Sequence, residues 1–155
     1  MNTKITEDAI EQLAIELLVE QGYNFLHGAE LAIDAHSPER TSFSDVILQQ
    51  RLRDAIARIN PTIPYEAQQQ AVKEVLNIHP TELLSANEHF HKLLTDGVEV
   101  EYQHDSRTKG DKVWLVDFAD AANNNHLVVN QFTVIENHVN KRPDLILFIN
   151  GLPLV

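Results

Sequence analysis

The sequence predicts an α/β fold in which helices flank a mixed, largely antiparallel sheet. Apolar residues recur at helical spacing through most of the first 97 residues, and the spacing then changes to a period of two. The final segment, from Arg142 to Val155, contains an apolar run, Leu145 to Ile149, followed by the turn dipeptide Asn150-Gly151. These observations indicate helices in the first part of the chain and a sheet from about Val98 onward.

The first predicted helix runs from Thr6, its expected N-cap, to about Gly22. Glu7 and Asp8 suit the positive end of the helix dipole. Glu7 and Glu11 lie one turn apart and share a face, which is either a solvated helix edge or part of a site. The apolar stripe that we expect to face the core consists of Ile10, Leu13, Ala14, Leu17 and Leu18.

A helical insertion is expected between about residues 44 and 97, after a short strand from Tyr23 to Leu26. Its first helix begins at about Asp45, its second at Pro64, and its third after Pro80-Thr81. The inward side of the third helix is expected to carry Leu83, Phe90, Leu93 and Leu94.

The strands expected after the insertion follow from alternating apolar and polar residues. Val98 to Tyr102 forms the first strand, and His104 to Asp111 forms the turn of its hairpin. Lys112 to Phe118 and Leu127 to Ile135 form the next two strands, and the C-terminal hairpin completes the sheet.

The C-terminal hairpin is the most specific local pattern in the chain. The unbroken apolar run from Leu145 to Ile149 is typical of a strand buried on both faces. An Asn-Gly turn favours type I′ geometry, because both central residues need positive φ. In the simplest register Ile149 faces Leu152, and Phe148 faces Pro153 in a non-hydrogen-bonded pair that does not need the missing proline N–H.

One acidic residue, Asp144, stands at the start of this apolar strand, directly after Pro143. An ionised carboxylate there is costly unless it caps a backbone group, pairs with a cation or binds a metal. Its position alone leaves a metal ligand and a capping residue as open alternatives. The residues opposite it would lie a few positions beyond Val155, so we interpret the chain as the front part of a longer polypeptide.

The segment RPDLILFINGLPLV resembles the first catalytic motif of the PD-(D/E)xK nuclease domain at the N-terminus of type I restriction enzyme R subunits. Four upstream segments are similar to the same family in the same order, so the resemblance covers nearly the whole chain. They are residues 6–23, 42–64, 86–102 and 113–134. The chain departs from the family because it lacks the Glu-x-Lys half of the site and the ATP-driven motor domains.

The resemblance implies a restriction-endonuclease-like fold and a single N-terminal endonuclease domain over residues 1–155, incomplete at its C-terminal end. It implies that Asp144 is a catalytic residue and a ligand of Mg²⁺, with the second carboxylate and the lysine supplied by the absent Glu-x-Lys. Glu7 is a further candidate metal ligand, since several nucleases of this superfamily carry an acidic residue on the first helix near the metal. Arg142 and Lys141 are candidate DNA-binding residues.

The functional hypothesis is metal-dependent hydrolysis of DNA phosphodiester bonds by the R subunit of a type I restriction enzyme, with this fragment inactive by itself. The partners that the resemblance implies are DNA and the methylation and specificity subunits. ATP would act only through motor domains outside this chain, which has no Gly-rich phosphate loop. A cytoplasmic location is expected, because there is no cysteine, no secretory leader and no apolar run of membrane-spanning length.

The net charge of −11, from 12 basic and 23 acidic residues, opposes tight DNA binding by this chain alone. Either other parts of the polypeptide bind the DNA, or this chain does not touch DNA. The alternative function is therefore a non-enzymatic, acidic interaction or scaffold domain that docks other subunits. A Glu-x-Lys within about ten residues of Val155 would support the nuclease, because hairpin pairing would bring it beside Asp144. A stop codon there would support the scaffold.

Other polar residues in the sequence form weaker patterns. Asp34 and His36 are expected to belong to a surface loop. His89 and His91 lie two residues apart on a predicted helix, so they point to different sides and do not form one metal site. Gln131 lies in a family-like Asn-Gln-Phe segment, and we expect it to be a satisfied sheet residue.

Overall fold

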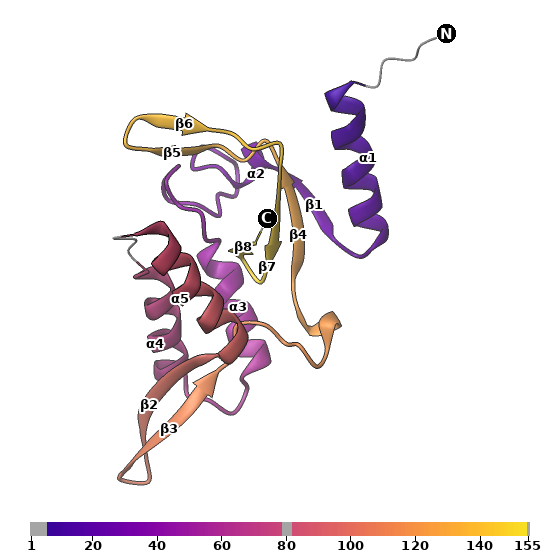
Figure 1. Cartoon of the computed structure of the whole chain (residues 1–155). Helices are drawn as coiled ribbons and strands as arrows, with labels where there is room; N and C mark the ends of the chain where they lie inside the picture. The colour runs from indigo at the N-terminus through magenta and orange to yellow at the C-terminus, as the bar shows by residue number, and fades with distance from the viewer. Residues whose placement is uncertain (1–5, 79–81, 155) are drawn as a thin grey trace. The chain divides into compact units, whose positions relative to one another are not determined.

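The computed structural model describes residues 6–78 and 82–154 and has a mixed α/β fold, as predicted (Figure 1). The chain forms two compact units, of which the first contains Met1–Gln49 and Asn125–Val155 and the second contains Gln50–Asn124. The inserted unit therefore extends further along the chain than the predicted helical insertion. Within the described ranges, no helix has the length and apolar character required to cross a membrane.

The first unit is built on a four-stranded sheet with the strand order β1-β4-β7-β8. β1 is parallel to β4, whereas the β4–β7 and β7–β8 pairs are antiparallel, so this sheet is mixed and largely antiparallel. The helices and strands of this unit are α1 (Glu7–Glu20), β1 (Asn24–His27), α2 (Gly28–Leu31), β4 (His126–Asn130), β5 (Val134–Glu136), β6 (Val139–Lys141), β7 (Leu145–Ile149) and β8 (Leu152–Pro153).

The two faces of this sheet are covered differently. One face packs on the main apolar cluster, in which the Phe132 and Phe148 rings meet edge to face with centroids 5.4 Å apart. The other members of the cluster are Leu31, Leu48, Leu127 and Val129.

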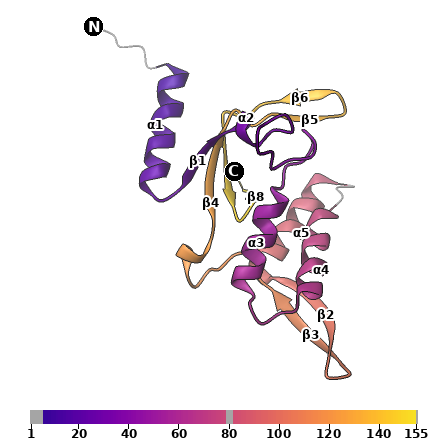
Figure 2. The same ribbon diagram turned by 180° about the vertical axis from the view of Figure 1, so that it is seen from behind.

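Helix α1 packs against the edge strand β1 (Figure 2). Its predicted N-cap is confirmed, because Thr6 Oγ1 accepts a hydrogen bond from the Ala9 N–H at 3.3 Å.

The predicted C-terminal hairpin is confirmed in turn type and register. Asn150 and Gly151 have φ values of 53° and 79°, and the cross-strand pairs are Ile149–Leu152 and Phe148–Pro153. The next residue, Leu154, donates its N–H to the Leu147 carbonyl at 2.9 Å, so the ladder continues on the far side of the proline. Val155 lies outside the described residues.

Asn150 also ties this hairpin to the beginning of β4. Its side chain is buried, and its Oδ1 accepts a hydrogen bond from the Asn125 N–H at 2.7 Å. The Asn150 N–H donates in return to the Asn125 carbonyl at 2.8 Å. The turn residue therefore contributes more than its backbone conformation, because it also satisfies the backbone of the neighbouring strand.

The described part of the second unit contains three α-helices, a separate two-stranded ribbon and a short 3₁₀ turn. Its elements are α3 (Gln49–Ile59), α4 (Tyr65–Leu76), α5 (Leu83–Asp96), β2 (Val98–His104), β3 (Arg107–Val113) and the 3₁₀ turn η1 (Ala121–Asn123). Among the described strands, β2 and β3 form a two-stranded sheet of their own, so the expectation of one sheet from Val98 onward is wrong for this ribbon. The turn is also shorter than predicted. His104 pairs with Arg107, and the two residues between them, Asp105 and Ser106, both have positive φ.

Two helix predictions in this part of the chain require correction. Leu83 was expected to face inward, but its side chain is largely exposed, and Pro80 and Thr81 lie outside the described residues. α3 begins at Gln49 rather than Asp45, because the Asp45 carboxylate holds a turn instead of a helix. It accepts hydrogen bonds from the Thr41 N–H and the Ser42 N–H, each at 2.9 Å, and from the Thr41 hydroxyl at 2.8 Å.

Gly28, the first residue of α2, is packed tightly against the backbone at the end of β4. A Cβ atom at this position would lie 2.8 Å from the Gln131 carbonyl carbon and 2.9 Å from the Phe132 Cα, and it would collide with the Gln131 carbonyl oxygen. Backbone atoms cannot yield as a flexible side chain does. The sequence therefore needs glycine here to bring α2 against the segment after β4.

We predict that Gly28→Ala lowers the free energy of unfolding by about 1–3 kcal/mol, the usual cost of overpacking. The matched control is Gly110→Ala in β3, where an added Cβ meets no atom within 4 Å. Removing a strand glycine there is expected to be neutral or slightly stabilising. Urea unfolding of both variants measures the difference, and equal stabilities would contradict the close packing at Gly28.

The Asp45 turn gives a prediction about pH. Burial alone raises the pKa of Asp45, but hydrogen bonds from Thr41 and Ser42 and the positive charge of Arg40 outweigh it and leave the pKa below its usual value. A carboxyl group whose pKa is lowered by folding stabilises the fold at pH values above its unfolded pKa, which is about 4 for aspartate. This stabilisation is lost as the pH falls through the lower pKa of the folded state.

Asp45→Asn should therefore lower the free energy of unfolding by about 1–2 kcal/mol at pH 7. The difference between the variant and the parent should shrink as the pH approaches about 3, where the parent carboxylate also begins to protonate. Urea unfolding at both pH values checks this. A difference that stays constant with pH would show that the Asp45 charge is not involved.

Candidate functional site

Asp144 is an exposed residue immediately before β7, at the point where β4 ends. Its carbonyl oxygen accepts a hydrogen bond from the Gln131 N–H at 3.1 Å, which extends the β4–β7 ladder one step beyond the Asn130–Leu145 pair. Gln131 has a φ of 53°, so the chain leaves the strand there. The backbone of Asp144 is thus fixed beside the last residues of β4.

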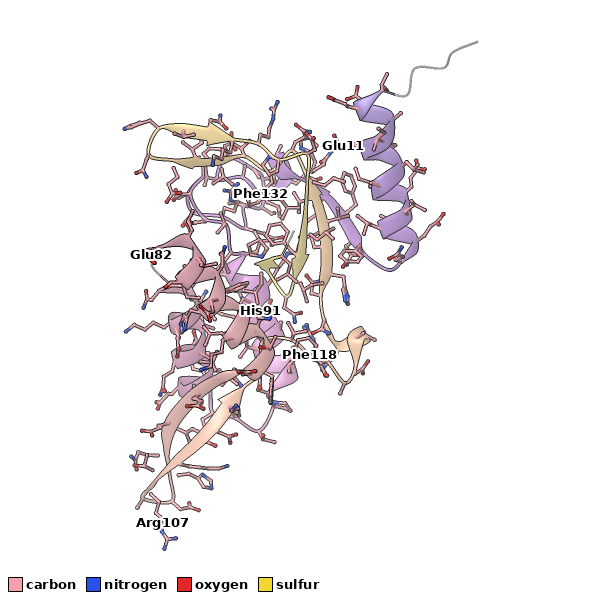
Figure 3. All side chains as sticks on the ribbon, in the orientation of Figure 1. Glu11, Glu82, His91, Arg107, Phe118 and Phe132 are labelled. Carbon is pink, nitrogen blue, oxygen red and sulfur yellow. The ribbon has the colours of Figure 1, made fainter. Side chains whose placement is uncertain are left out.

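Glu11 of α1 reaches the same end of β4 from a distant part of the sequence (Figure 3). Its Oε1 accepts a hydrogen bond from Asn130 Nδ2 at 2.9 Å, and its Oε2 accepts one from Gln131 Nε2 at 3.4 Å. Both donors are neutral amides, so they orient the carboxylate without neutralising its charge. Gln131 therefore hydrogen-bonds to both residues, with its side-chain amide to Glu11 and with its backbone N–H to the Asp144 carbonyl.

Asn130 carries an unsatisfied polar atom at this position. Its Oδ1 is buried and accepts no hydrogen bond from any residue that the structure describes. Buried polar atoms in folded proteins nearly always have a partner, so an orphan acceptor beside a carboxylate needs an explanation. A bound water or a cation would satisfy it.

The oxygen atoms gathered here have the chemistry of a site for a hard divalent cation. They are the carboxylate of Glu11, the orphan amide oxygen of Asn130 and the backbone carbonyl of Asp144, whose own carboxylate follows one residue before β7. Within residues 6–78 and 82–154, no three histidine, aspartate or glutamate side chains form a metal-binding group. A cation at the end of β4 would therefore have at most two carboxylate ligands from these residues. Mg²⁺ accepts this, because it usually keeps several waters and takes one or two carboxylates.

The remaining predicted site residues are near Glu11 or near Asp144 in the sequence. Glu7 is exposed one turn before Glu11, at the start of α1. Lys141, the last residue of β6, and Arg142 are both exposed on the segment that leads into Asp144. Two cationic residues thus precede Asp144, with Pro143 between them and the aspartate.

Arg40 was not predicted from the sequence, yet it fixes the segment that follows Gln131. Only 4% of its surface is exposed, and it donates hydrogen bonds to the carbonyls of Thr133 and Phe43 at 2.7 Å and of Asp45 at 2.9 Å. Its guanidinium carbon lies 4.0 Å from the centre of the Phe132 ring. Burial lowers the pKa of Arg40, and the charge of Asp45 partly offsets that effect.

The histidine pairs considered from the sequence do not join this site. His36 and Asp34 are exposed in the loop after α2. His89 and His91 are exposed on α5 in the inserted unit, where His89 Nε2 lies 4.0 Å from Glu74 Oε1. The sequence patterns also did not indicate that Glu11 accepts hydrogen bonds from the Asn130 and Gln131 side chains. The only available signal was the face that Glu11 shares with Glu7, because the partners are 119 and 120 residues away.

Comparison with known proteins identifies related sequences. A family model described as the N terminus of the type I restriction enzyme R protein matches residues 4–155. The type I restriction enzyme HindI endonuclease subunit of Haemophilus influenzae is 37% identical over 152 residues, which is 97% of this chain and 14% of that protein. The putative type I restriction enzyme MjaIXP endonuclease subunit of Methanocaldococcus jannaschii is 37% identical over 155 residues, 97% of this chain and 15% of that protein.

We predict that Glu11→Ala lowers the free energy of unfolding by about 1.5–3 kcal/mol, because it removes hydrogen bonds to a charged group and leaves the Asn130 amide without its acceptor. Glu16→Ala is the matched control, since Glu16 is exposed on the same helix and accepts a hydrogen bond from the Gln12 amide one turn away. That change should cost about 0.5 kcal/mol or less. Thermal or urea unfolding compares the two, and equal losses would contradict a specific contact between α1 and β4.

Proposed function

The chain belongs to the N-terminal family of type I restriction enzyme R proteins and corresponds to the N-terminal region of an endonuclease subunit, and from this we propose that it is the front part of a metal-dependent DNA endonuclease domain. The reaction proposed is hydrolysis of DNA phosphodiester bonds. The chain spans about 14–15% of the length of the curated relatives that it matches. The activity of a whole subunit is therefore part of the proposal.

The observation that carries the proposal is the hydrogen bond between the Gln131 N–H and the Asp144 carbonyl. It supports a role for Asp144 as catalytic metal ligand, because it joins the aspartate to the end of β4, where the Glu11 carboxylate is held by Asn130 and Gln131. A capping role for Asp144 receives no comparable support, because among the described residues the hydrogen bond of Asp144 uses its backbone carbonyl.

Mg²⁺ bound at this place would supply positive charge for the developing phosphorane and would lower the pKa of a bound water. The residues of this chain would hold and orient it. Glu11 is the stronger candidate on α1, since two amides fix its carboxylate, while Glu7 remains a second candidate one turn earlier. The orphan Asn130 Oδ1 fits the same cation, directly or through a water.

The other half of the proposed site comes from the Glu-x-Lys of the resembling family. The β7–β8 register pairs Ile149 with Leu152 and Phe148 with Pro153, so the position opposite Asp144 falls beyond Val155. A Glu-x-Lys at that position would add a second carboxylate to the cation and a lysine beside the attacking water. By itself, the part of the site in this chain should bind a cation weakly and leave DNA uncut.

The charge of this chain determines how DNA would be held. With a net charge of −11, the chain offers few phosphate contacts, and we propose Lys141 and Arg142 as those nearest Asp144. Most of the DNA affinity would come from other parts of a longer subunit and from the methylation and specificity subunits. ATP would act through motor domains of that subunit, in the cytoplasm.

A non-enzymatic acidic scaffold that docks other subunits is the second candidate function. The same charge of −11 favours it, since acidic surfaces repel DNA and attract basic partners. The two functions differ in what they require of Asp144, which a scaffold does not need.

We predict that Asp144→Ala abolishes Mg²⁺-dependent plasmid cleavage by a full-length subunit assembled with its partners. Asp34→Ala is the matched control, because Asp34 is an exposed aspartate in the same unit and lies outside the site. It should leave the cleavage rate unchanged. Undiminished cleavage by the Asp144 variant, with a normal unfolding transition, would overturn the nuclease proposal for this residue.

We also predict that the 155-residue chain alone leaves plasmid DNA supercoiled in the presence of Mg²⁺, since half of the proposed site is absent. Agarose gel electrophoresis of incubated plasmid measures this. Cleavage that persists after repeated purification and disappears in the Asp144→Ala chain would show that the Glu-x-Lys half is dispensable.

A further inference from the structure

Helix α1 presents an apolar stripe to solvent rather than to the core. The stripe consists of Ile10, Leu13 and Leu17, which are spaced by three and four residues and are 58%, 55% and 49% exposed. The only buried side chain of the helix is Ile15. The sequence predicted that these three residues face the core together with Ala14 and Leu18. Ala14 and Leu18 are half-buried, but the prediction is wrong for Ile10, Leu13 and Leu17.

The sheet surface on the side of α1 is also incompletely covered. Glu11 reaches Asn130 on this face, and Asn130 pairs with Leu145, so alternation along β7 places Leu147 and Ile149 on the same face. All three of these β7 side chains are only half-buried. Phe25, which pairs with Val128 on this face, is 40% exposed.

The half-buried side chains of β7 lie on a strand whose sequence predicts burial on both faces. The five-residue apolar run of β7 is typical of a strand covered on both faces, and its other face does pack on the Phe148 cluster. α1 lies against the edge strand β1, and its Glu11 reaches Asn130 on this face. Exposed apolar side chains that gather on one face of a protein are typical of a docking site.

We propose that this surface, formed by the α1 stripe and the β7 side chains on the same face, docks a later segment of the same polypeptide. The chain spans only 14–15% of its relatives, so a subunit of their length has further chain to supply the segment. A segment of the same polypeptide also binds at a high effective concentration and needs no separate partner.

Charge distinguishes this occupant from a second copy of the chain. α1 carries five carboxylates and no lysine or arginine, so two α1 helices packed together would bring ten like charges into proximity. The docking segment is instead expected to be apolar along one side and flanked by lysine or arginine. This inference rests on family membership and exposed surface, and it does not depend on whether Asp144 binds a metal.

The test is the rate of maleimide labelling at single cysteines in a full-length subunit, read on the α1 peptide by mass spectrometry. Leu13→Cys and Leu17→Cys lie on the stripe, and Gln12→Cys and Glu16→Cys are exposed controls on the polar side of the same helix. The 155-residue chain contains no natural cysteine, so labelling within this region is specific. Each native rate is divided by the rate in urea.

We expect the two stripe positions to be labelled at least tenfold more slowly than the two controls in the full-length subunit alone. In the 155-residue chain all four positions should react at similar rates. Equal rates in the full-length subunit would overturn the proposal. Protection that appears only when another subunit is added would also overturn it. Protection of the 155-residue chain that increases with its concentration would overturn it as well, because it would indicate binding of a second copy.

Ile10→Cys provides a second stripe position in case Leu13→Cys disturbs packing, and the unfolding transition of each variant verifies that it is folded. Because the readout involves neither DNA nor metal, its failure is separate from failure of the nuclease proposal. A subunit with a protected stripe and no Asp144-dependent cleavage would retain the docking surface and lose only the proposed chemistry.

Discussion

The hydrogen bond from the Gln131 N–H to the Asp144 carbonyl is the constraint on which the candidate site depends. It is the last bond of the β4–β7 ladder, and it forms where positive φ at Gln131 turns the chain away from the sheet. Three neighbouring features keep that turn in place. Gly28 lets α2 approach it, Arg40 binds the carbonyl of Thr133 just after it, and Glu11 accepts the amides of Asn130 and Gln131.

The parts of the fold that the sequence predicted well are those set by local chemistry. The type I′ turn at Asn150-Gly151 needs positive φ at both residues, and so the hairpin and its register followed from one dipeptide and an apolar run. Periodicity likewise predicted the four main helices, and Thr6 marked the start of α1. Asp144 was identified for a related reason, because a carboxylate at the start of an apolar strand requires an explanation.

The parts that escaped prediction depend on contacts between distant residues. The β5–β6 hairpin and the polar strand β3 lack a strong alternating pattern of apolar residues, and their pairing with a neighbouring strand is visible only in the structure. Asp45 resembled a helix start, but three hydrogen bonds from Thr41 and Ser42 made it a turn. Glu11 and Arg40 could not be assigned from sequence, since each bonds to the β4–β5 region more than ninety residues away.

The candidate site and the exposed surface of α1 have one property in common. Each contains groups that lack a partner in the described structure: a buried acceptor, Asn130 Oδ1, at the site and exposed apolar side chains on α1. The most direct measurement for the site is broadening of amide resonances of the ¹⁵N-labelled chain by low Mn²⁺, read in two-dimensional spectra. We expect the amide resonances of Glu11, Gln131 and Asp144 to broaden first and to recover when excess Mg²⁺ is added. Broadening that begins elsewhere, for example at the Asp117–Asp120 turn of the inserted unit, would contradict a cation site at the end of β4.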